Sequence, residues 1–216
     1  MNLLNKEHID LAWPDIIGKS VCNESKFAID FFEQKLKNKE QGYALDLGAA
    51  DGICHNNVFE FFNEPYCWSG VSVDANPRFF DQRDNLFKDT NVQVYKGAIS
   101  NVNGSVRFNQ DSKNVGHSKV DVNGNIEVES LTVNTFLSKF KVPYLIDFVS
   151  MDLEGQEESI ITEWDFDKWQ VTMFCIERGY KFKNLMIEKG YNVVNSDGLS
   201  YKDYKFCHGN TFFIKN

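Results

Sequence analysis

The sequence lacks the cysteine arrangements that are typical of disulfide frameworks and zinc fingers. Its five cysteines are scattered, odd in number and without a Cys-x-x-Cys pair: Cys22, Cys54, Cys67, Cys175 and Cys207. This spacing argues against both kinds of site. We therefore expect reduced, mostly buried thiols, as in a cytoplasmic protein.

Long apolar runs are also missing. No stretch approaches the roughly 18 consecutive apolar residues that a membrane-spanning helix needs. The opening residues, MNLLNKEHIDLAWP, do not place a cationic region before a long apolar one. We therefore expect neither a signal peptide nor a membrane partner, and we expect a cytoplasmic location.

Basic runs and internal repeats are absent too. The 23 lysines and arginines are outnumbered by 31 aspartates and glutamates, which gives a net charge of −8. An acidic chain without a basic run binds phosphate backbones poorly, so we do not expect a nucleic-acid partner. The 216 residues suffice for one α/β domain with a sizeable core. We predict a single domain over residues 25–216, preceded by an N-terminal segment, 1–24.

The most informative stretch is YALDLGAADG, from Tyr43 to Gly52. A short apolar run ends in a glycine-containing turn, and apolar residues then recur at nearly helical spacing. This pattern predicts a buried strand, a tight turn and a helix. Glycine at positions 48 and 52 permits positive φ and close approach of a ligand. Free N–H groups at the helix start favour a carboxylate-bearing group, and Asp46 suits an ammonium group or hydroxyls.

The glycine spacing in this stretch does not match the dinucleotide-binding pattern G-x-G-x-x-G. Asp46 and Asp51 would also repel a pyrophosphate and suit a ligand that carries a positive charge. The pattern D-x-G-x-x-x-G after a strand is similar to the first motif of S-adenosylmethionine-dependent methyltransferases. The alternative is an ordinary strand–turn–helix unit of an α/β domain.

Asp74 ends a second predicted strand, Trp68 to Val73, and lies 22 residues beyond Gly52 (74 − 52). An acidic residue at this place in doubly wound folds binds ribose hydroxyls. The alternative is a solvated aspartate at a helix entry, because Asn76 and Pro77 form a strong helix-start signal. A third strand is predicted over Val92 to Ala98.

Two Asn-Gly dipeptides, at 103–104 and 123–124, follow the third strand and indicate two β-hairpins. We expect residues of about 100–130 to form an insertion that shapes the substrate site, because loops beyond strand carboxyl ends line the ligand crevice. His117 lies in this insertion. It is a candidate catalytic residue or, alternatively, a solvated loop histidine.

A near-continuous apolar run, Leu145 to Met151, predicts a central parallel strand. Asp152 and Glu154 follow it. Side chains alternate along a strand, so we expect both carboxylates to point the same way, where like charges raise one pKa. The alternative is helix capping by Glu154 with Asp152 solvated. Glu177 and Arg178 end a fifth strand, Val171 to Ile176, as site residues or as a surface ion pair.

The remaining apolar patterns complete an α/β fold. Helices are predicted over 23–39, 132–140, 156–163 and 181–188. The last two strands, Tyr191 to Asn195 and Thr211 to Ile214, would place one strand antiparallel in an otherwise parallel sheet.

With these motifs in place, residues of about 25–216 resemble the FkbM family of S-adenosylmethionine-dependent methyltransferases. The resemblance is carried by LDLGAADG, VDANP, GAIS with its Asn-Gly hairpin, DFVSMDLEGQE and the closing GNTFF. It implies a Rossmann-like, seven-stranded, mostly parallel methyltransferase sheet with helices on both faces. The usual activity implied is O-methylation of a sugar or polyketide hydroxyl.

The resemblance also assigns residues to S-adenosylmethionine. Gly48 and its neighbours Ala49, Ala50 and Gly52 would surround the methionine part. Asp74, with Ala75 and Asn76 beside it, would hold the ribose, and Ala98 and Ile99 would flank the adenine. Asp152 would lie beside the methyl-transfer position. Met151 stands where a lysine is common before this aspartate, so any role of that lysine does not carry over.

The hypothesis is therefore methyl transfer from S-adenosylmethionine to a hydroxyl of a sugar, glycan or related small molecule. Candidates for the base are Asp152, Glu154 and His117. A variant assisted by Mg²⁺ or Mn²⁺ would use Asp152, Glu154, Glu177 and His208, but their spacing is no ligand signature, so a metal is not expected. The alternatives are a nucleotide-sugar oxidoreductase and a degenerate methyltransferase kept as a binding subunit. The sequence specifies neither the acceptor nor the oligomeric state.

Overall fold

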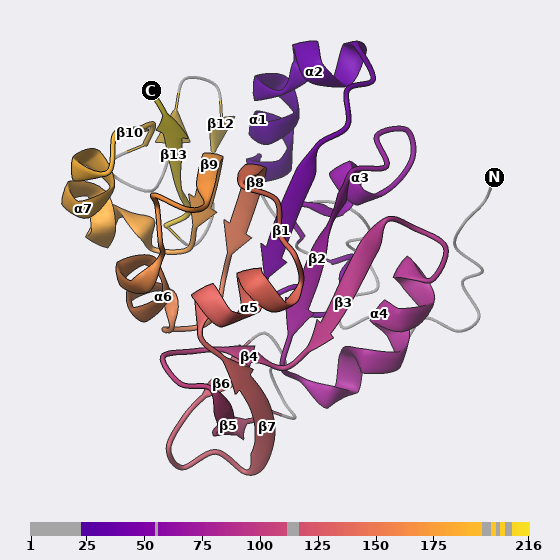
Figure 1. Ribbon diagram of the computed structural model, residues 1–216, viewed down its shortest axis with the longest axis vertical. Helices are drawn as coiled ribbons and strands as arrows, with labels where there is room; N and C mark the ends of the chain where they lie inside the picture. The colour runs from indigo at the N-terminus through magenta and orange to yellow at the C-terminus, as the bar shows by residue number, and fades with distance from the viewer. Residues whose placement is uncertain (1–22, 55, 112–116, 196–199, 202–203, 206–208) are drawn as a thin grey trace.

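The computed structural model describes residues 23–54, 56–111, 117–195, 200–201, 204–205 and 209–216. Most of the predicted N-terminal segment, residues 1–22, and the candidate ligand His208 lie outside this part of the chain. Within it, seven strands form one twisted sheet in the order β10-β13-β9-β8-β1-β2-β3 (Figure 1). Their bounds are β1 Tyr43–Leu47, β2 Ser69–Asp74, β3 Val92–Lys96, β8 Leu145–Met151, β9 Gln170–Ile176, β10 Tyr191–Val193 and β13 Thr211–Lys215.

The sheet is parallel except for β13, which runs antiparallel to both β9 and β10, as the sequence predicts. The chain leaves β1 through β2 and β3 on one side and returns to β8 on the other side. The order therefore reverses between β1 and β8, and a crevice opens at such a point outside the carboxyl ends of the strands. A short ladder of β11 (Ser200–Tyr201) and β12 (Tyr204–Lys205) is separate from this sheet.

Helices cover both faces of the sheet (Figure 1). On one face lie α1 (Glu24–Phe31), α2 (Glu33–Lys37), α3 (Phe59–Phe62) and α4 (Phe80–Phe87), the last preceded by a 3-10 turn, Pro77–Phe79. On the other lie α5 (Val133–Lys139), α6 (Glu157–Glu163) and α7 (Lys183–Glu188), the last after the 3-10 turn Gly179–Phe182. The predicted helix over 23–39 is thus present but interrupted at Phe32.

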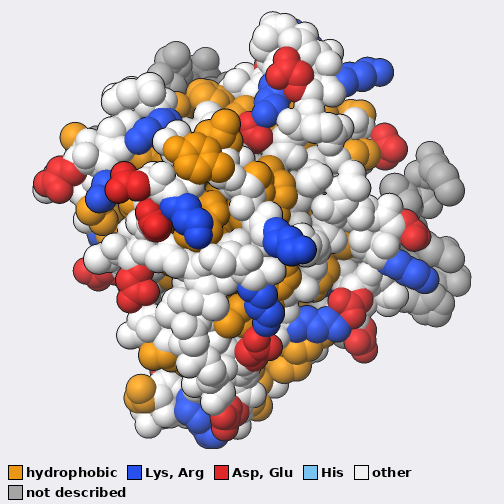
Figure 2. Space-filling model, in the orientation of Figure 1, with side chains coloured by type: hydrophobic (Ala, Val, Ile, Leu, Met, Phe, Trp, Pro, Cys, Tyr) orange, Lys and Arg blue, Asp and Glu red, His pale blue; other side chains and the backbone are white. Residues whose placement is uncertain are grey.

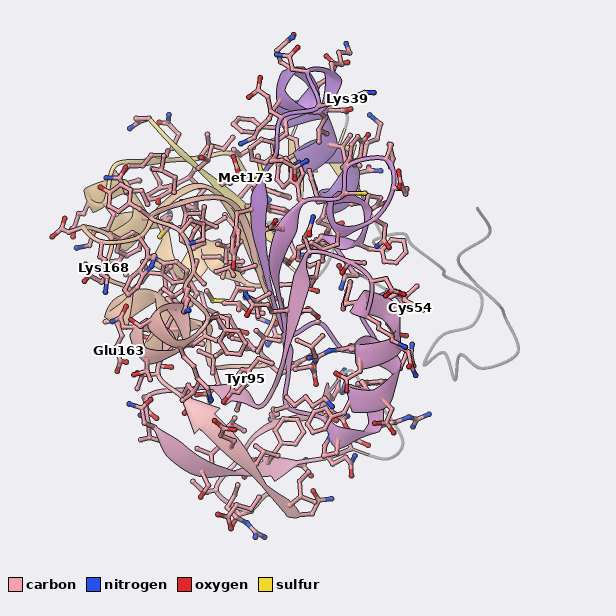
Figure 3. The ribbon with its side chains drawn as sticks, turned by 45° about the vertical axis from the view of Figure 1, so that its right-hand side comes forward. Lys39, Cys54, Tyr95, Glu163, Lys168 and Met173 are labelled. Atoms are coloured by element: carbon pink, nitrogen blue, oxygen red, sulfur yellow. The ribbon has the colours of Figure 1, made fainter. Side chains whose placement is uncertain are left out.

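Each face has its own apolar core. The α1–α4 face is rich in aromatic rings, including Phe32, Phe61 and Trp68. Figure 3 shows Met173 of β9 within the crowded interior, where it is fully buried. On the other face, Tyr95 of β3 packs against Phe136 of α5, with ring centroids 5.9 Å apart. These two cores fix the strand ends that form the site.

The prediction of a helix directly after the glycine turn is wrong. Residues 48–54 form turns and bends, and α3 begins only at Phe59. The cause is Asp51, whose buried carboxylate accepts hydrogen bonds from the N–H groups of Ile53 (2.9 Å) and Cys54 (2.8 Å). A side chain that binds nearby backbone N–H groups competes with helix formation. These N–H groups are therefore not available to a ligand.

The insertion after β3 is present, but its strands do not pair as predicted. It forms a four-stranded sheet of β4 (Ala98–Ile99), β7 (Ile126–Leu131), β5 (Gly104–Asn109) and β6 (Lys119–Val120), in that spatial order. Neither Asn-Gly dipeptide joins two strands that pair with each other, because β4 pairs parallel with β7 and β5 lies between β7 and β6. Instead, the Asn103 side chain accepts the Thr132 N–H (2.9 Å), and Gly124 N donates to the Asp121 carbonyl (2.8 Å).

The surface drawn in Figure 2 carries both signs of charge, with lysines and arginines interspersed among aspartates and glutamates. Among the helices that the structure describes, none has the length and apolar character needed to cross a bilayer.

Candidate active site

A cavity of about 350 Å³ opens at the carboxyl ends of β1, β2, β8 and β9, within the size range of small-molecule sites. The parallel strands direct their ends to this one edge, so residues distant in sequence meet there. The predicted cofactor residues on its wall are Asp46, Gly48, Ala49, Ala50, Asp74, Ala75, Asn76, Ala98, Ile99 and Asp152. The three predicted catalytic candidates, Asp152, Glu154 and His117, line it too.

Gly52 lies elsewhere. Its backbone has φ of +79°, and a Cβ at this position would meet Leu86 (3.1 Å) and Phe87 (3.4 Å) of α4. Gly52 thus lets the loop pack against α4 and is not on the cavity wall. Asp51 also turns away from the cavity, to bind the backbone of its own loop.

Gly48 forms the floor where the first loop leaves β1. Its N–H and that of Ala49 both donate to the Val73 carbonyl, at 3.0 and 2.8 Å. On the other side, Asp152 N donates to the Leu47 carbonyl at 2.9 Å. The loop is thus tied to the ends of both neighbouring strands, and its φ of +95° is one that glycine adopts readily.

Asp74, at the end of β2, organises the loops around it. One carboxylate oxygen accepts the Ala50 N–H (2.8 Å) and the other accepts the Asn76 N–H (2.7 Å). Asn76 in turn donates to Ser118 Oγ (3.3 Å) and accepts from Gln110 Nε2 (2.8 Å), so the insertion is anchored over this corner. Burial raises the pKa of Asp74, while Arg83 and the two backbone N–H groups oppose that rise.

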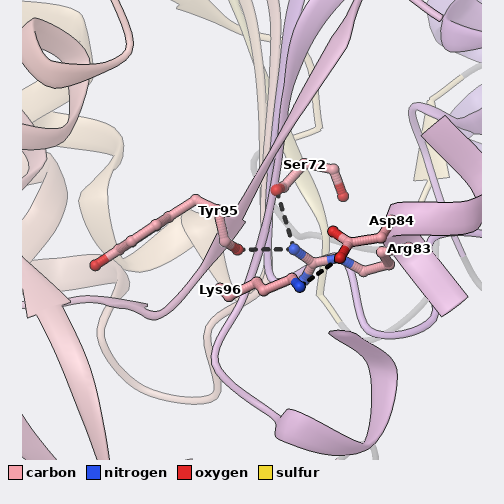
Figure 4. Close-up of polar contacts among 5 residues, drawn as sticks. All are labelled: Ser72, Arg83, Asp84, Tyr95 and Lys96. Atoms are coloured by element: carbon pink, nitrogen blue, oxygen red, sulfur yellow. Dashed lines mark hydrogen bonds and ion pairs between the residues drawn. The ribbon is translucent and has the colours of Figure 1, made fainter. Parts of the chain in front are cut away.

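Arg83, which the sequence did not single out, is a fully buried cation behind this corner. Its Nη2 donates to the carbonyls of Ser72 (3.1 Å) and Tyr95 (2.7 Å), and so joins β2 to β3 (Figure 4). Its Nε and Nη1 have no hydrogen-bond partner in the described part of the chain. Its charge lowers the pKa of Asp74 and of Asp46, so it favours the ionised form of both. The available signal was the position of Arg83, four residues from both Phe79 and Phe87 and therefore on the buried face of a mostly polar helix.

Asp46 is a buried carboxylate at the centre of the cavity wall. Its Oδ2 accepts a hydrogen bond from Asn56 Nδ2 at 2.7 Å. Burial raises the pKa of Asp46 to about 7, although Asn56 and Arg83 oppose the rise. The adjacent Asn57 donates to Ser150 Oγ (3.1 Å). These two asparagines also line the cavity, and sequence reasoning passed over them because they follow an apparent helix start.

Three carboxyl groups, which we call the acid trio, meet at the other end: Asp152, Glu157 and Glu177. One oxygen of each lies within 4.8 Å of the others. Glu157, the first residue of α6, is fixed by the N–H groups of Leu153 (2.7 Å) and Gly155 (3.0 Å). The Glu177 Oε1 pairs with Arg178 at 3.1 Å. The buried Oε2 has no N–H or hydroxyl donor among the described residues, and the Glu177 carboxylate is within hydrogen-bonding reach of Asp152 when Asp152 is protonated.

Proximity within the trio perturbs its ionisation. Burial raises the pKa of Asp152 well above its usual value, and the charges of Glu177, Glu154 and Glu157 add to this. Asp152 is exposed to the cavity, yet protein atoms crowd around it, so burial remains the main cause. Burial likewise raises the pKa of Glu177 to about 7, while Arg178 opposes the rise. Perturbed carboxyl groups in a cavity are typical of functional sites.

The charge of Glu154 raises the pKa of Asp152, as the sequence predicts, but the acid that meets Asp152 and Glu177 within 4.8 Å is Glu157. The strand ends at Met151, so side-chain alternation ends there, and Glu154 follows in a turn with φ of +52°. Glu154 still lines the cavity but is not in the trio. Glu157 was missed although it is the last residue of the quoted stretch DFVSMDLEGQE. His117 is exposed at the rim, just before β6.

No curated protein matches the chain. Among solved structures, the chain is similar to a precorrin-6y C5,15-methyltransferase from Geobacter metallireducens GS-15, at 15% identity and a TM-score of 0.46. The match covers 89% of this chain and 87% of that one, and says nothing of the substrate here. The model of the methyltransferase FkbM domain matches residues 46–194, more than half of the chain. The chain therefore belongs to the FkbM family of S-adenosylmethionine-dependent methyltransferases.

Proposed function

We propose that this methyltransferase transfers its methyl group to a hydroxyl of a sugar, a glycan or a related small molecule. The observation that carries the proposal is the concentration of carboxyl groups at the end of the cavity where β8 and β9 terminate. Carboxylates accept hydrogen bonds from hydroxyl groups and can take their protons.

The residues present fit S-adenosylmethionine. The backbone of Gly48 and Ala49 lines the cavity floor, where the methionine part would lie against it. Each Asp74 oxygen accepts one backbone N–H, and so retains a lone pair for a ribose hydroxyl. Ala98 and Ile99 supply an apolar wall for the adenine. Asp46, when ionised, suits the ammonium group.

S-adenosylmethionine supplies an electrophilic methyl group on a positively charged sulfur. The carbon–sulfur bond breaks with its electron pair going to sulfur, while a lone pair of the acceptor oxygen forms the new carbon–oxygen bond. The hydroxyl proton passes to a basic side chain at the cavity. The cavity holds the acceptor in place, and a positioned base contributes typically about 10²–10⁴-fold to the rate. Asp152, Glu154 and His117 remain the candidates.

The charge of the site favours a neutral, hydroxyl-rich acceptor. Asp152, Glu154 and Glu177 on the cavity wall would repel a phosphate group. A nucleic-acid acceptor is disfavoured for the same reason and by the net charge of −8. Free thiols at Cys54, Cys67 and Cys175 are compatible with a cytoplasmic location, which stays a prediction.

Membership of a methyltransferase family displaces the nucleotide-sugar oxidoreductase considered from the sequence. The remaining alternative is a degenerate methyltransferase that only binds. The ionisable groups at four strand ends, Asp46, Asp74, Asp152 and Glu177, all line the cavity and argue against it.

The experiment is a methyl-transfer assay with labelled S-adenosylmethionine and matched acceptors: neutral sugars and glycans, their amino-sugar counterparts, their phosphate esters, and short RNA. We expect label in a neutral acceptor, with the methyl ether located by mass spectrometry. Label only in the amine, the phosphate ester or the RNA would contradict the proposal. Calorimetry with S-adenosylhomocysteine, the product left after methyl transfer, tests the degenerate alternative. A chain that has lost its cofactor site should not bind this product.

A further inference from the structure

We propose that the acid trio of Asp152, Glu157 and Glu177 binds a divalent metal ion of the Mg²⁺ or Mn²⁺ class. The proposal rests on the proposed function, because the ion would act on the hydroxyl of the acceptor. The trio spans three elements: Asp152 follows β8, Glu157 begins α6, and Glu177 follows β9. The residue spacing therefore gives no sign of the site, which exists only in the folded chain.

The distances within the trio suit such an ion. Mg²⁺ takes oxygen ligands at about 2.0–2.1 Å, so two ligand oxygens on opposite sides of it stand about 4.2 Å apart. One oxygen of each carboxyl group in the trio lies within 4.8 Å of the others. Small side-chain adjustments therefore bring all three to one centre. Carboxylate oxygens are the ligands that Mg²⁺ and Mn²⁺ prefer.

A second observation, independent of the clustering, points to a ligand. Glu177 is only 3% exposed, and it lines the cavity. Its Oε1 is paired with Arg178, but when the acid trio is ionised the buried Oε2 has no hydrogen-bond donor among the described residues, and only a proton on Asp152 would supply one. A buried oxygen without a partner costs about 1–3 kcal/mol, so such atoms in proteins call for an explanation. A cation bound at Oε2 removes this cost.

Glu157 has lone pairs to spare. Its oxygens accept hydrogen bonds from the N–H groups of Leu153 and Gly155, which orient the carboxylate without using all of its acceptor capacity. Among the described residues, the cation that forms an ion pair with the trio is Arg178, and its partner is Glu177. If all three groups are ionised, three negative charges face one guanidinium, and a divalent ion would offset the repulsion that otherwise raises the pKa of Asp152 and of Glu177.

The ion would acidify the acceptor. Coordination of a hydroxyl oxygen by a divalent ion makes loss of its proton easier. As in the proposed reaction, the carbon–sulfur bond of the methyl donor breaks and a carbon–oxygen bond forms. With Asp152 engaged as a ligand, the carboxylate left on this part of the cavity wall is Glu154, and the hydroxyl proton passes to it.

The test is a titration of the full chain with Mn²⁺, followed by the electron paramagnetic resonance signal of the free ion. We expect one Mn²⁺ per chain. Glu177→Gln should weaken binding at least tenfold, while Glu158→Gln, an exposed acid on the same helix as Glu157, should leave it unchanged. Should Glu177→Gln not fold, Asp152→Asn provides the same comparison, with circular dichroism as the check on folding.

Binding of S-adenosylhomocysteine, measured in the same samples, separates this proposal from the proposed function. Product binding without stoichiometric Mn²⁺ binding would overturn the metal site and leave methyl transfer standing. Mn²⁺ binding that Glu177→Gln and Asp152→Asn do not weaken would also overturn it. Mn²⁺ bound as expected by a chain that does not bind the product would uphold the site and reject the proposed function.

Discussion

The carbonyl oxygen of Asp152 lies 1.7 Å from the point where a Cβ atom on Gly48 would stand. No side chain fits there, because real Cβ atoms stay beyond about 3 Å from such an oxygen. The loop after β1 and the end of β8 therefore touch through backbone alone. This contact sets the floor of the cavity and places the loop after β1 beside Asp152.

Gly48→Ala should destabilise the chain and push the loop after β1 away from the end of β8. The new Cβ clashes with Asp152, and φ of +95° is strained for alanine. We expect a loss of about 2–4 kcal/mol in the free energy of unfolding, measured by urea denaturation. The matched control is Gly104→Ala, which has a similar φ of +123° but no atom within 4 Å of its Cβ. Equal losses in the two variants would contradict a steric role.

Binding of S-adenosylhomocysteine should strengthen as pH rises from 6 to 8. The pKa of Asp46 is raised to about 7 by burial, so the carboxylate that suits the ammonium group ionises in this range. Calorimetry at several pH values measures the change. In Asp46→Asn the affinity should be lower and nearly independent of pH across this window. An unchanged pH profile in that variant would remove Asp46 from the site.

Asp46 should also make the free energy of unfolding depend on pH, in the opposite sense to product binding. The unfolded chain loses this proton near the ordinary aspartate pKa of 3.8, and the folded chain loses it near 7. Between these values the folded state holds the extra proton, so the Asp46 contribution to the free energy of unfolding falls as pH rises and levels off above about 7. Wild type should therefore lose stability relative to Asp46→Asn over this interval, as urea denaturation can show.

Arg83→Met should move the pH midpoint of product binding upward. Without the buried cation, Asp46 and Asp74 ionise at higher pH. The variant also loses the bonds that join β2 to β3, so a loss of about 2–4 kcal/mol in stability is expected. The neighbouring Lys96–Asp84 pair is exposed (Figure 4), and Lys96→Met should cost at most about 1 kcal/mol. A midpoint that shifts equally in both variants would argue against a specific effect of Arg83.

Asp152→Asn should abolish turnover while the fold remains intact. The carboxylate is required whether it takes the acceptor proton or binds an ion. Steady-state kinetics with the neutral acceptor, together with circular dichroism, provide the measurement. The control is Glu163→Gln at an exposed position of α6. Near-normal activity in Asp152→Asn would exclude this residue from the chemistry.

The base can be assigned by comparing Glu154→Gln with His117→Ala. Glu154 lies on the cavity wall beside the trio, whereas His117 is exposed at the rim. We expect Glu154→Gln to lower kcat by about 10²-fold or more and His117→Ala to change it by less than about fivefold. The reverse ranking would make His117 the base. A pH–rate profile of each variant checks that a titrating group has been removed.

The sequence alone predicted the strands that end at the cavity. An apolar run followed by a polar residue, as at Leu145–Met151 and Asp152, is a local signal, because a central strand must be apolar on both faces. The parallel direction of these strands then brought Asp46, Asp74, Asp152 and Glu177 to one edge. The predicted cofactor residues line the cavity with the exception of Gly52.

The wrong predictions concern segments whose local sequence is compatible with two structures. Contacts elsewhere in the fold determine which of the two forms. The Asn-Gly dipeptides indicated hairpins, but β7 found partners in β4 and β5, which lie far from it in the chain. The helix expected after Gly48 gave way to the turn that Asp51 stabilises. A local sequence pattern indicates which structures a segment can form. Strand pairing and side-chain hydrogen bonds in the folded chain determine which of them it adopts.

Which acids meet was decided only by the tertiary structure. The sequence alone shows which polar residues follow each strand and in what order, because that information is local. Two arrangements depend on how four strands and two helices pack: the meeting of Asp152, Glu157 and Glu177, and the position of Arg83 behind Asp74. Ionisation depends on those distances and on burial, which arise only when the chain has folded.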